Sequence, residues 1–404
     1  MKILHTGDWH LGKKLGEYSR IEEQKAVLDE ICKIADEENV DAILIAGDLY
    51  DNFNPASDAI ELFYKTLHKL SNEGQRIVVA IAGNHDSPER IEAPTPLANE
   101  CGIVLLGFPL TIPKSFILKS GLRISKTDRG FLEVYLPKYI YPLRILLTPY
   151  ANEVRLKEYF ETKNSDDAMN QCLKNHWDTL ANQYCDANGV NILMTHLYMM
   201  ERNGTQEKEP EDERSIVYLG GASPVMTDII PNQIQYTAVG HLHRQHFVKG
   251  HQSPVMYSGS LLEYSFSETN QQKYVLIIEA VPQKPVDVTP VPLQSGKKLK
   301  RVRFKAANEA LYWLENNQNC FVELTFATEK YIESNIKQSF FQAHQGIVHL
   351  IPEILSEVSY NSTNVQIDTT KQIEELFIEY FIKMNGNQPN KELLDLFKEI
   401  MNVE

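Results

Sequence analysis

Gly7-Asp8-Trp9-His10 is the first of three polar motifs that indicate the fold of this chain, and the others are Gly47-Asp48-Leu49-Tyr50-Asp51 and Gly83-Asn84-His85-Asp86. Each motif directly follows a short apolar run that is predicted to be a buried strand, at residues 2–5, 42–46 and 77–81. The intervening segments, 22–38 and 56–70, carry apolar residues at helical spacing. This alternation predicts a layered α/β domain with polar side chains at the strand ends.

Histidines end two later apolar runs. Thr195-His196 follows residues 191–194, and Gly240-His241-Leu242-His243 follows residues 236–239. Open α/β sheets place their active sites where the carboxyl ends of the strands converge. We therefore expect all five motifs to meet in one site.

The side chains of these motifs suit a pair of divalent metal ions. Carboxylates, imidazoles and one carboxamide are donors for manganese, iron or zinc, and no thiolate is needed. A residue that bridges two cations must be an anion with two oxygens, and Asp48, at the end of a central strand, is the best candidate. The spacings Asp8-x-His10 and His241-x-His243 place two side chains on one side of an extended segment.

Each motif alone has a plainer explanation. An isolated Asp-x-His or His-x-His is more often loop polarity than a metal site, and an isolated Gly-Asn-His is better explained by a turn. Independent turns would not supply a complete set of donors for two metals, so together the motifs predict a bimetal centre. Six other histidines lack a partner pattern and are interpreted as structural or surface residues: His68, His176, His246, His251, His344 and His349.

Length and composition fit a globular protein of two or more folding units. The chain has 404 residues, 43% of them hydrophobic and 23% charged, near the averages for folded domains. No apolar run is long enough to span a bilayer and the first residues lack a secretory pattern, so we expect a soluble, cytoplasmic protein. The five cysteines never form a CxxC pair, which argues against a disulfide framework and a thiolate zinc site.

The net charge of −14 counts against a nucleic-acid substrate, because an acidic chain repels a polyanion at long range. A DNA-handling chain of this charge needs metal ions, a local basic patch or a basic partner. The most basic short run spans residues 297–305, where Lys298, Lys300, Arg301 and Arg303 are candidates for DNA contacts. A charged edge strand that discourages aggregation is an equally good interpretation.

Closely spaced prolines between Pro282 and Pro292 predict a linker or domain boundary, which divides the chain into residues 1–281, 282–358 and 359–404. The middle part alternates strand-like and helix-like segments and is expected to be a smaller α/β domain. After a polar linker, two stretches repeat apolar residues at helical spacing. Their candidate residues for binding a partner are Phe377, Tyr380, Phe381, Leu394 and Phe397.

The motif series resembles that of the calcineurin-like metallophosphoesterases. Three further segments are similar to those of the SbcD-type nuclease subunits within that superfamily: Gly220-Gly221-Ala222, Tyr257-Ser258-Gly259-Ser260-Leu261-Leu262 and Ser265-Phe266-Ser267-Glu268. The likeness covers nearly the whole chain. It implies a four-layer α/β fold, a β-sandwich flanked by helices, with a smaller α/β capping domain and C-terminal helices. Glu263 departs from a pattern suited to a phosphate backbone, so DNA contact by that serine-rich loop is not expected.

Carried over by position, the resemblance assigns two ligand sets that share one aspartate. One metal would be held by Asp8, His10, Asp48 and His243, and the other by Asp48, Asn84, His196 and His241. His85 would face the substrate as general acid or transition-state donor, with Asp51 orienting it. A supporting role behind the ligands is the alternative for His85. Mn²⁺ is the expected metal.

The resemblance also implies an activity and partners. Such a chain would process DNA double-strand ends, as a 3′–5′ double-strand exonuclease and a single-strand or hairpin endonuclease, in DNA repair, recombination and replication. It would act as a homodimer within a heterotetramer that includes an SbcC-type coiled-coil ATPase. The chain itself has no phosphate-binding loop motif for ATP. The C-terminal helices are the expected docking element, and packing on the chain's own second domain is the alternative.

Two rival functions stay open from the residues alone. A metal core does not specify its substrate, so a phosphatase or phosphodiesterase acting on a small phosphoester is the main rival. The second is a non-catalytic scaffold that holds DNA or a partner. The complete ligand set argues against the scaffold.

Overall fold

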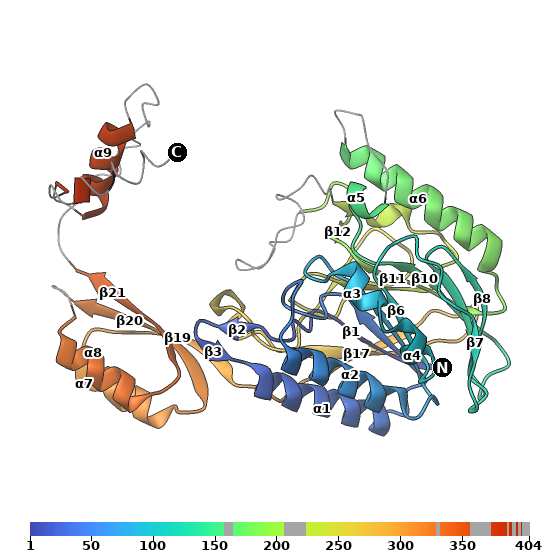
Figure 1. Ribbon diagram of the computed structural model, residues 1–404, viewed down its shortest axis with the longest axis horizontal. Helices are drawn as coiled ribbons and strands as arrows, with labels where there is room; N and C mark the ends of the chain where they lie inside the picture. Colours follow the sequence, from blue (N-terminus) through green and yellow to red (C-terminus); the bar gives the residue numbers. More distant parts are fainter. Residues whose placement is uncertain are drawn as a thin grey trace. The chain divides into compact units, whose positions relative to one another are not determined.

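The computed structural model describes residues 1–156, 165–205, 224–328, 332–355 and 373–385, together with 388, 389, 393, 394 and 397 (Figure 1). The chain divides into two compact units, Met1–Ile354 and Leu355–Glu404. Within the described ranges, no helix combines the length and apolarity needed to cross a membrane.

The first sheet has six strands in the order β18-β17-β1-β4-β5-β6. The strands are β1 (Lys2–Thr6), β4 (Ala42–Ala46), β5 (Ile77–Ile81), β6 (Ile103–Leu106), β17 (Tyr274–Glu279) and β18 (Asp287–Pro292). Strands β1, β4, β5 and β6 are parallel, so their carboxyl ends lie at one edge. The three strands predicted in this region are confirmed to within one residue.

Helices α1 (Ile21–Glu37) and α2 (Ser57–Ser71) cover the outer face of the first sheet (Figure 1). Leu28 and Phe63 from the helices share a core with Ile43 and Val78 from the sheet. Each helix is displaced by one residue from its predicted range. Two short helices, α3 (Pro88–Glu92) and α4 (Thr95–Asn99), lead from β5 to β6.

The second sheet has eight strands in the order β15-β16-β14-β11-β10-β9-β8-β7. The strands are β7 (Phe116–Ile117), β8 (Arg123–Asp128), β9 (Phe131–Tyr135), β10 (Leu143–Thr148), β11 (Val190–His196), β14 (Tyr236–Gly240), β15 (His246–Val248) and β16 (Val255–Tyr257). Its outer face packs against α6 (Ser165–Tyr184) through Leu173 and Trp177. A core between the sheets includes Leu44 and Ile192. The expected four layers, helix, sheet, sheet and helix, are thereby confirmed.

Short elements complete this part of the molecule. They are β2 (Lys14–Leu15), β3 (Tyr18–Ser19), α5 (Glu153–Leu156), β12 (Met199–Met200), β13 (Val225–Met226) and the 3₁₀ turns η1 (Thr227–Ile229) and η2 (Phe266–Glu268). Gly220-Gly221-Ala222, one of the segments similar to the SbcD-type subunits, lies outside the described residues.

The last part of the proline-rich stretch, which was predicted as a linker or boundary, instead forms strand β18. It pairs antiparallel with β17, with Pro290 opposite Leu276 and Pro292 opposite Tyr274. Because β18 is an edge strand, prolines can occupy it without removing a hydrogen bond needed by a further strand. Residues 287–292 therefore belong to the first sheet, and the smaller domain begins after them.

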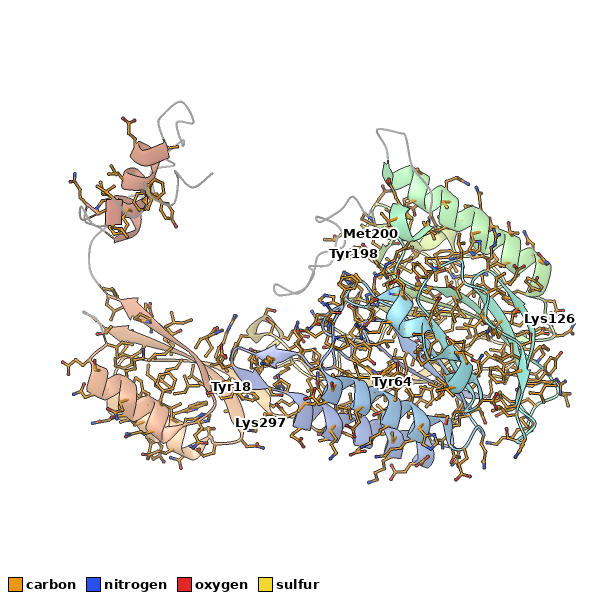
Figure 2. The ribbon with its side chains drawn as sticks, viewed as in Figure 1. Tyr18, Tyr64, Lys126, Tyr198, Met200 and Lys297 are labelled. Carbon is orange, nitrogen blue, oxygen red and sulfur yellow. The ribbon has the colours of Figure 1, made fainter. Side chains whose placement is uncertain are left out.

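The smaller domain has a parallel sheet of β19 (Lys298–Phe304), β20 (Cys320–Thr328) and β21 (Ile347–Ile354), in that order. Helices α7 (Ala307–Asn316) and α8 (Ser334–Ala343) pack on it through a core that includes Leu314 and Phe340. Tyr18 and Lys297 mark its junction with the larger part (Figure 2). The Tyr18 hydroxyl donates to the carbonyl of Gln345 at 2.6 Å, and Leu299 and Phe321 share a small core with Leu15 and Phe266.

The tail contains helix α9 (Ile373–Asn385), which the periodicity predicted. Phe377 stacks on Phe397 with ring centroids 4.1 Å apart. Of the second predicted tail helix, Leu393, Leu394 and Phe397 are described, whereas Ile400 and Met401 lie outside the described residues. The polar linker expected at residues 359–369 also lies outside them.

Candidate metal centre

The seven candidate metal ligands come together where strand ends of the two sheets meet. Asp8, His10, Asp48 and Asn84 follow strands of the first sheet, and His196, His241 and His243 end or follow strands of the second. His10 Nε2 lies 3.0 Å from His243 Nε2, and His196 Nε2 lies 2.9 Å from Asn84 Oδ1. All seven are buried. The expected convergence of the five motifs is therefore present in the structure.

Asp48 lies between two groups of donors. Its Oδ2 is 3.3 Å from His196 Nε2 and 3.7 Å from His10 Nε2. One group is Asp8, His10 and Asp48 and the other is Asp48, His196 and His241, and the potential ligand atoms within each lie within 4.8 Å of one another. A carboxylate shared by both groups is placed as a bridging anion would be.

The backbone at these donors is strained. Asp8, His10, Asp48 and His241 have φ angles of 50°, 44°, 47° and 106°, in the left-handed region that costs about 1–3 kcal/mol for a residue with a side chain. Glycines next to Asn84 and His241 also allow a close approach of chain segments. A Cβ on Gly83 would lie 2.0 Å from Asp48 Oδ1, and one on Gly240 would lie 1.8 Å from the Ala46 carbonyl oxygen.

The orientation of His196 fits a site for a cation. Its Nδ1 donates to the carbonyl of Ala46 at 2.8 Å, so in the neutral ring the Nε2 lone pair faces the acceptor oxygens of Asp48. A lone pair and acceptor oxygens repel one another unless a positive charge lies between them. A proton or a metal ion can supply that charge. Burial alone would lower the pKa of His196, but Asp48 and then Asp8 raise it to about 9.

The two aspartates of the centre respond differently to burial. Burial raises the pKa of Asp8 to about 7. Burial also opposes ionisation of Asp48, but the charge of His196, followed by that of His85, holds its pKa below the usual range. Asp48 is therefore an anion at neutral pH, whereas Asp8 in the metal-free chain exchanges a proton near pH 7. The carboxylates, imidazoles and one carboxamide at the centre match the borderline divalent ions expected from the motifs.

His85 adjoins this cluster, and its contact with Asp51 differs from the expected one. His85 Nδ1 donates to the backbone carbonyl of Asp51 at 2.7 Å. The Asp51 carboxylate instead lies 3.3 Å from Lys13 Nζ and 3.8 Å from His10 Nδ1. The contact of Asp51 with His85 is thus made by its carbonyl, where an anionic side chain was expected, and the orienting role of Asp51 stays a prediction. A carbonyl only accepts, so Nδ1 carries the proton of the neutral ring.

Asp86 and Arg155 hold the loops that carry Asp48 and Asn84. The Asp86 carboxylate accepts backbone N–H groups from Gly83, Leu49 and Tyr50 at 2.8–3.0 Å. Arg155 donates to the carbonyls of Gly83 and Asp86, both at 2.9 Å. Burial and the charge of Asp48 raise the pKa of Asp86 to about 6. Asp86 belongs to one of the motifs identified in the sequence. The sequence around Arg155, by contrast, did not indicate that Arg155 contacts these loops.

Gln24 holds the loop that carries His10. This side chain of α1 is fully buried. It donates to the His10 carbonyl at 2.7 Å and to the Tyr264 hydroxyl at 3.0 Å, and it accepts the N–H of Gly12 at 3.0 Å. Helical spacing predicted that Gln24 lies on α1 but gave no signal for this contact.

Glu268 and Lys273 form a buried ion pair behind His243. Glu268 Oε1 accepts from His243 Nδ1 at 2.9 Å, and Glu268 Oε2 pairs with Lys273 Nζ. Burial opposes ionisation of Glu268, but Lys273, followed by His243, lowers its pKa to about 2. The segment ending at Glu268 was singled out in the sequence, yet its spacing did not connect it with His243.

The candidate DNA-contacting residues lie on β19, an edge strand of the small sheet. Arg301 pairs with Glu323 at 2.7 Å and Arg303 with Glu353 at 2.6 Å. Two of the four predicted cations are therefore matched by acidic side chains of their own sheet, which favours the edge-strand interpretation. Glu263, the departure noted in the serine-rich loop, is buried at the domain junction, where it accepts the N–H of Leu299 at 2.7 Å.

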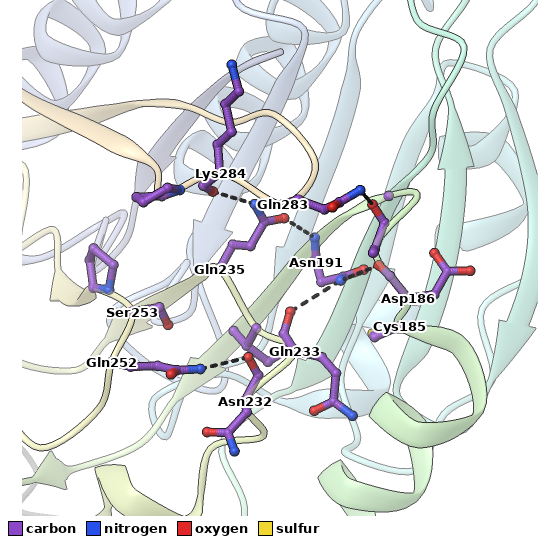
Figure 3. A pocket seen from close by; sticks show the side chains of 15 residues that line it. Cys185, Asp186, Asn191, Asn232, Gln233, Gln235, Gln252, Ser253, Gln283 and Lys284 are labelled. Carbon is purple, nitrogen blue, oxygen red and sulfur yellow. Dashed lines mark hydrogen bonds between the residues drawn. The ribbon is translucent and has the colours of Figure 1, made fainter.

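A separate cavity of about 540 Å³ lies where β11 and β14 begin, at the ends of these strands opposite the metal centre (Figure 3). Carboxamides are prominent in its lining, and several of them hold its loops. Gln235 donates to the Lys284 carbonyl at 2.7 Å, and Asn191 donates to that of Asp186 at 3.0 Å. None of the seven candidate metal ligands lines it.

Comparisons with known proteins identify the family. The crystal structure of TT1561 of Thermus thermophilus aligns with a TM-score of 0.37 and 15% identity, over 72% of this chain and 98% of that one. Residues 1–245 match the calcineurin-like phosphoesterase family. The chain is 35% identical over 413 residues to the SbcD subunit of nuclease SbcCD from Bacillus subtilis (strain 168), covering 99% of this chain and 97% of that protein. The chain therefore belongs to the calcineurin-like phosphoesterases and, within them, to the SbcD-type nuclease subunits, a family of metal-dependent phosphodiester hydrolases.

Proposed function

We propose that this chain is the nuclease subunit of an SbcC–SbcD-type complex and that it processes DNA double-strand ends with two divalent metal ions, expected to be Mn²⁺. The observation that carries the proposal is the pair of donor groups that share Asp48. The named relative from Bacillus subtilis supports the assignment to a nuclease complex. The proposed activities are 3′–5′ double-strand exonuclease and single-strand or hairpin endonuclease.

The proposed ligand sets follow the two donor groups. Asp8, His10, Asp48 and His243 would hold one ion, and Asp48, Asn84, His196 and His241 the other. Bound there, two ions would lower the pKa of a water molecule and neutralise charge on the attacking and leaving oxygens.

The chain's own residues supply orientation and a proton. The Asp51 carbonyl fixes Nδ1 of His85 as a donor, which leaves Nε2 as the atom that holds or transfers a proton. Nε2 of the protonated ring would donate to the sugar oxygen that leaves when the phosphodiester is cleaved. Asp86, Arg155 and Gln24 keep the donor loops in place through the backbone contacts described above.

The charge distribution favours action within a complex. The chain carries a net charge of −14, and Arg301 and Arg303 are ion-paired within their own sheet. Long-range attraction of DNA would therefore depend on bound metal ions or on a partner. We propose that an SbcC-type coiled-coil ATPase is that partner, in a cytoplasmic heterotetramer with two copies of this chain, acting in DNA repair, recombination and replication.

A nuclease assay of the purified chain with and without Mn²⁺ tests this proposal. The substrates are a duplex labelled at its 5′ ends, a single strand, a hairpin and a small phosphodiester such as bis(p-nitrophenyl) phosphate. We expect Mn²⁺-dependent shortening of the duplex from its 3′ ends and cleavage of the hairpin. Hydrolysis of the small diester alone, also when the ATPase subunit is added, would favour the small-molecule rival. Absence of all hydrolysis would favour the scaffold.

Asp48→Ala is the matched variant for this assay. Removing the proposed bridging anion leaves two cations without their shared neutralising group, so we expect loss of bound metal and of all cleavage. If metal analysis still finds two ions per chain, the assignment of Asp48 as the bridge is wrong.

A further inference from the structure

The side chain and backbone of His243 are held by one buried ion pair. Glu268 and Lys273 are 2% and 4% exposed. Glu268 Oε1 accepts the proton of His243 Nδ1 at 2.9 Å. Lys273 Nζ pairs with the other carboxylate oxygen and donates to the His243 carbonyl and to Ser260 Oγ, both at 3.0 Å. The imidazole is therefore fixed with Nε2 directed toward the donors of the metal centre.

His196, in the other proposed ligand set, has a different support. Its Nδ1 donates to the carbonyl of Ala46 at 2.8 Å, which is a neutral acceptor. Both imidazoles are buried, so exposure to solvent does not distinguish them. A hydrogen bond to a carboxylate makes an imidazole a stronger donor to a metal than one to a neutral carbonyl, because the anion stabilises positive charge on the ring.

The remaining ligands of the two proposed sets also differ in charge, and the set that contains His243 is the more negative one. The set that contains His243 includes two carboxylates, Asp8 and Asp48. The set that contains His196 includes Asp48 and the neutral carboxamide of Asn84. Greater negative charge and the hydrogen bond from His243 to a carboxylate both favour a divalent cation at the His243 position.

We propose that the Glu268–Lys273 pair is a positioning device that makes the His243 position the tighter of two unequal metal sites, so that it is filled first and the His196 position fills at higher metal concentration. This inference rests on the proposed two-metal function. Activity would then depend on metal concentration through the weaker site, where the second ion completes the centre.

Titration of the metal-free full chain with Mn²⁺, followed by the loss of the free-ion signal in electron paramagnetic resonance, tests this inference without a nuclease assay. We expect two binding steps in the wild-type chain. His243→Ala should remove the tighter step, and His196→Ala should remove the weaker one. If His243→Ala leaves the tighter step intact, the order of the sites is wrong.

Glu268→Gln keeps the size of the side chain and removes its charge, and Glu268→Gln with Lys273→Met removes both charges of the pair. Comparing the two variants separates loss of the carboxylate from the effect of an unpaired Lys273. We expect the tighter step to weaken about 10- to 100-fold, with the weaker step changed by less than about threefold. Glu268→Asp, which keeps the charge, should restore most of the affinity and provides the test if Glu268→Gln does not fold. An unchanged tight step in Glu268→Gln, or equal weakening of both steps, would overturn the inference.

Glu263→Gln is the matched control. Glu263 lies in the preceding loop and is 3% exposed, but its carboxylate accepts the N–H of Leu299 at the domain junction. We expect both metal-binding steps to be preserved in this variant. A wild-type chain that binds fewer than two ions would refute the proposed two-metal function itself. Two ions bound with equal affinity would refute only the inequality of the sites.

Discussion

At the scale of single residues, the site depends on backbone contacts that support the proposed reacting groups. The Asp51 carbonyl holds His85, the Ala46 carbonyl holds His196, and the N–H groups of three residues converge on Asp86. The two carbonyl contacts fix which nitrogen of each neutral imidazole ring carries the proton before any substrate is present.

His85→Gln should reduce Mn²⁺-dependent strand cleavage by at least about 100-fold, because it removes a proton donor, while two metal ions stay bound. Metal content by mass spectrometry and cleavage rate are measured on the same preparation. Asp51→Asn is the informative comparison, since it keeps the carbonyl that holds His85 and should cost less activity than His85→Gln. Loss of metal from His85→Gln would instead make His85 a ligand.

Metal binding should release protons and strengthen with pH between 6 and 8. In the metal-free chain the pKa of Asp8 is raised to about 7 and that of His196 to about 9, so both groups carry protons in part or all of this range. A metal ion must displace those protons, which costs less as pH rises. Calorimetric titration with Mn²⁺ in two buffers of different ionisation enthalpy should show release of about one to two protons at pH 7. Equal affinity at pH 6 and 8 would contradict this assignment.

The convergence of the candidate donors was predictable from sequence because each follows or ends a buried strand in a short motif. Their supports were not, because Gln24, Arg155 and Glu268 are far in sequence from the groups they contact. Helical spacing places Gln24 on α1 but does not show which groups its side chain contacts. The role of Asp51 was assigned to its side chain because a sequence cannot show that a carbonyl makes the contact.

At the scale of elements, strands β1, β4 and β5 and helices α1 and α2 were predicted to within one residue, whereas strand β6 and helix α6 were not predicted. Strand β8 was missed because it is partly exposed and lacks a regular apolar pattern. Strand β18 was missed because its prolines indicate a break, whereas an edge strand tolerates them. In both cases the strand forms because it pairs with a neighbouring strand, and a local window of sequence does not show that pairing.

A polar contact between the two sheets should make stability depend on pH. His5 in β1 and Tyr236 in β14 are buried, with His5 Nδ1 2.9 Å from the tyrosine hydroxyl, and burial lowers the pKa of His5 to about 3. Below pH 6.5 the unfolded chain takes up a proton at His5 that the folded chain excludes. The free energy of unfolding should therefore fall as pH decreases from about 6.5 toward 3, by about 1.4 kcal/mol per pH unit from this residue.

The double variant His5→Leu with Tyr236→Phe tests this contribution, because it removes both polar groups and approximately keeps their volume. Urea unfolding of metal-free wild type and variant is measured at pH 6 and pH 4. We expect the variant to lose about 2–3 kcal/mol less than the wild type between these pH values. The acidic groups of the metal centre titrate in both proteins, so their contribution cancels in the comparison. Equal losses would show that His5 does not carry the effect.

At the scale of the whole molecule, the smaller domain is fixed to the larger one by carboxylates of α1. Glu30 accepts the N–H groups of Gln294 and Ser295 at 2.8 Å, and Glu23 accepts that of Lys297 at 2.6 Å. Glu263 adds the contact to Leu299. Composition and proline spacing predicted a second domain but not this junction, because its contacts join surfaces distant in sequence. Residues 1–354 consequently form one compact unit.

The tail begins a second unit after residue 354, and its deletion should separate partner binding from catalysis. The proposed metal ligands end at His243, and Phe377 makes aromatic contacts with Phe381 and Phe397 inside the tail itself. Tyr380 is 62% exposed, and large aromatic side chains of this kind often dominate the energy of an interface. A chain that lacks residues 370–404 should therefore stay soluble, bind two metal ions and hydrolyse a small phosphodiester.

The same truncated chain should fail to co-purify with the ATPase subunit when the two are co-expressed. Tyr380→Asp in the full-length chain is the matched point variant, because it places a charge on α9 without removing the tail. We expect it to weaken co-purification at least tenfold, the loss that follows from about 1.4 kcal/mol of binding energy, and to leave hydrolysis of the small diester unchanged. If the truncated chain aggregates or loses metal, the tail belongs to this chain's own core and the ATPase must bind elsewhere.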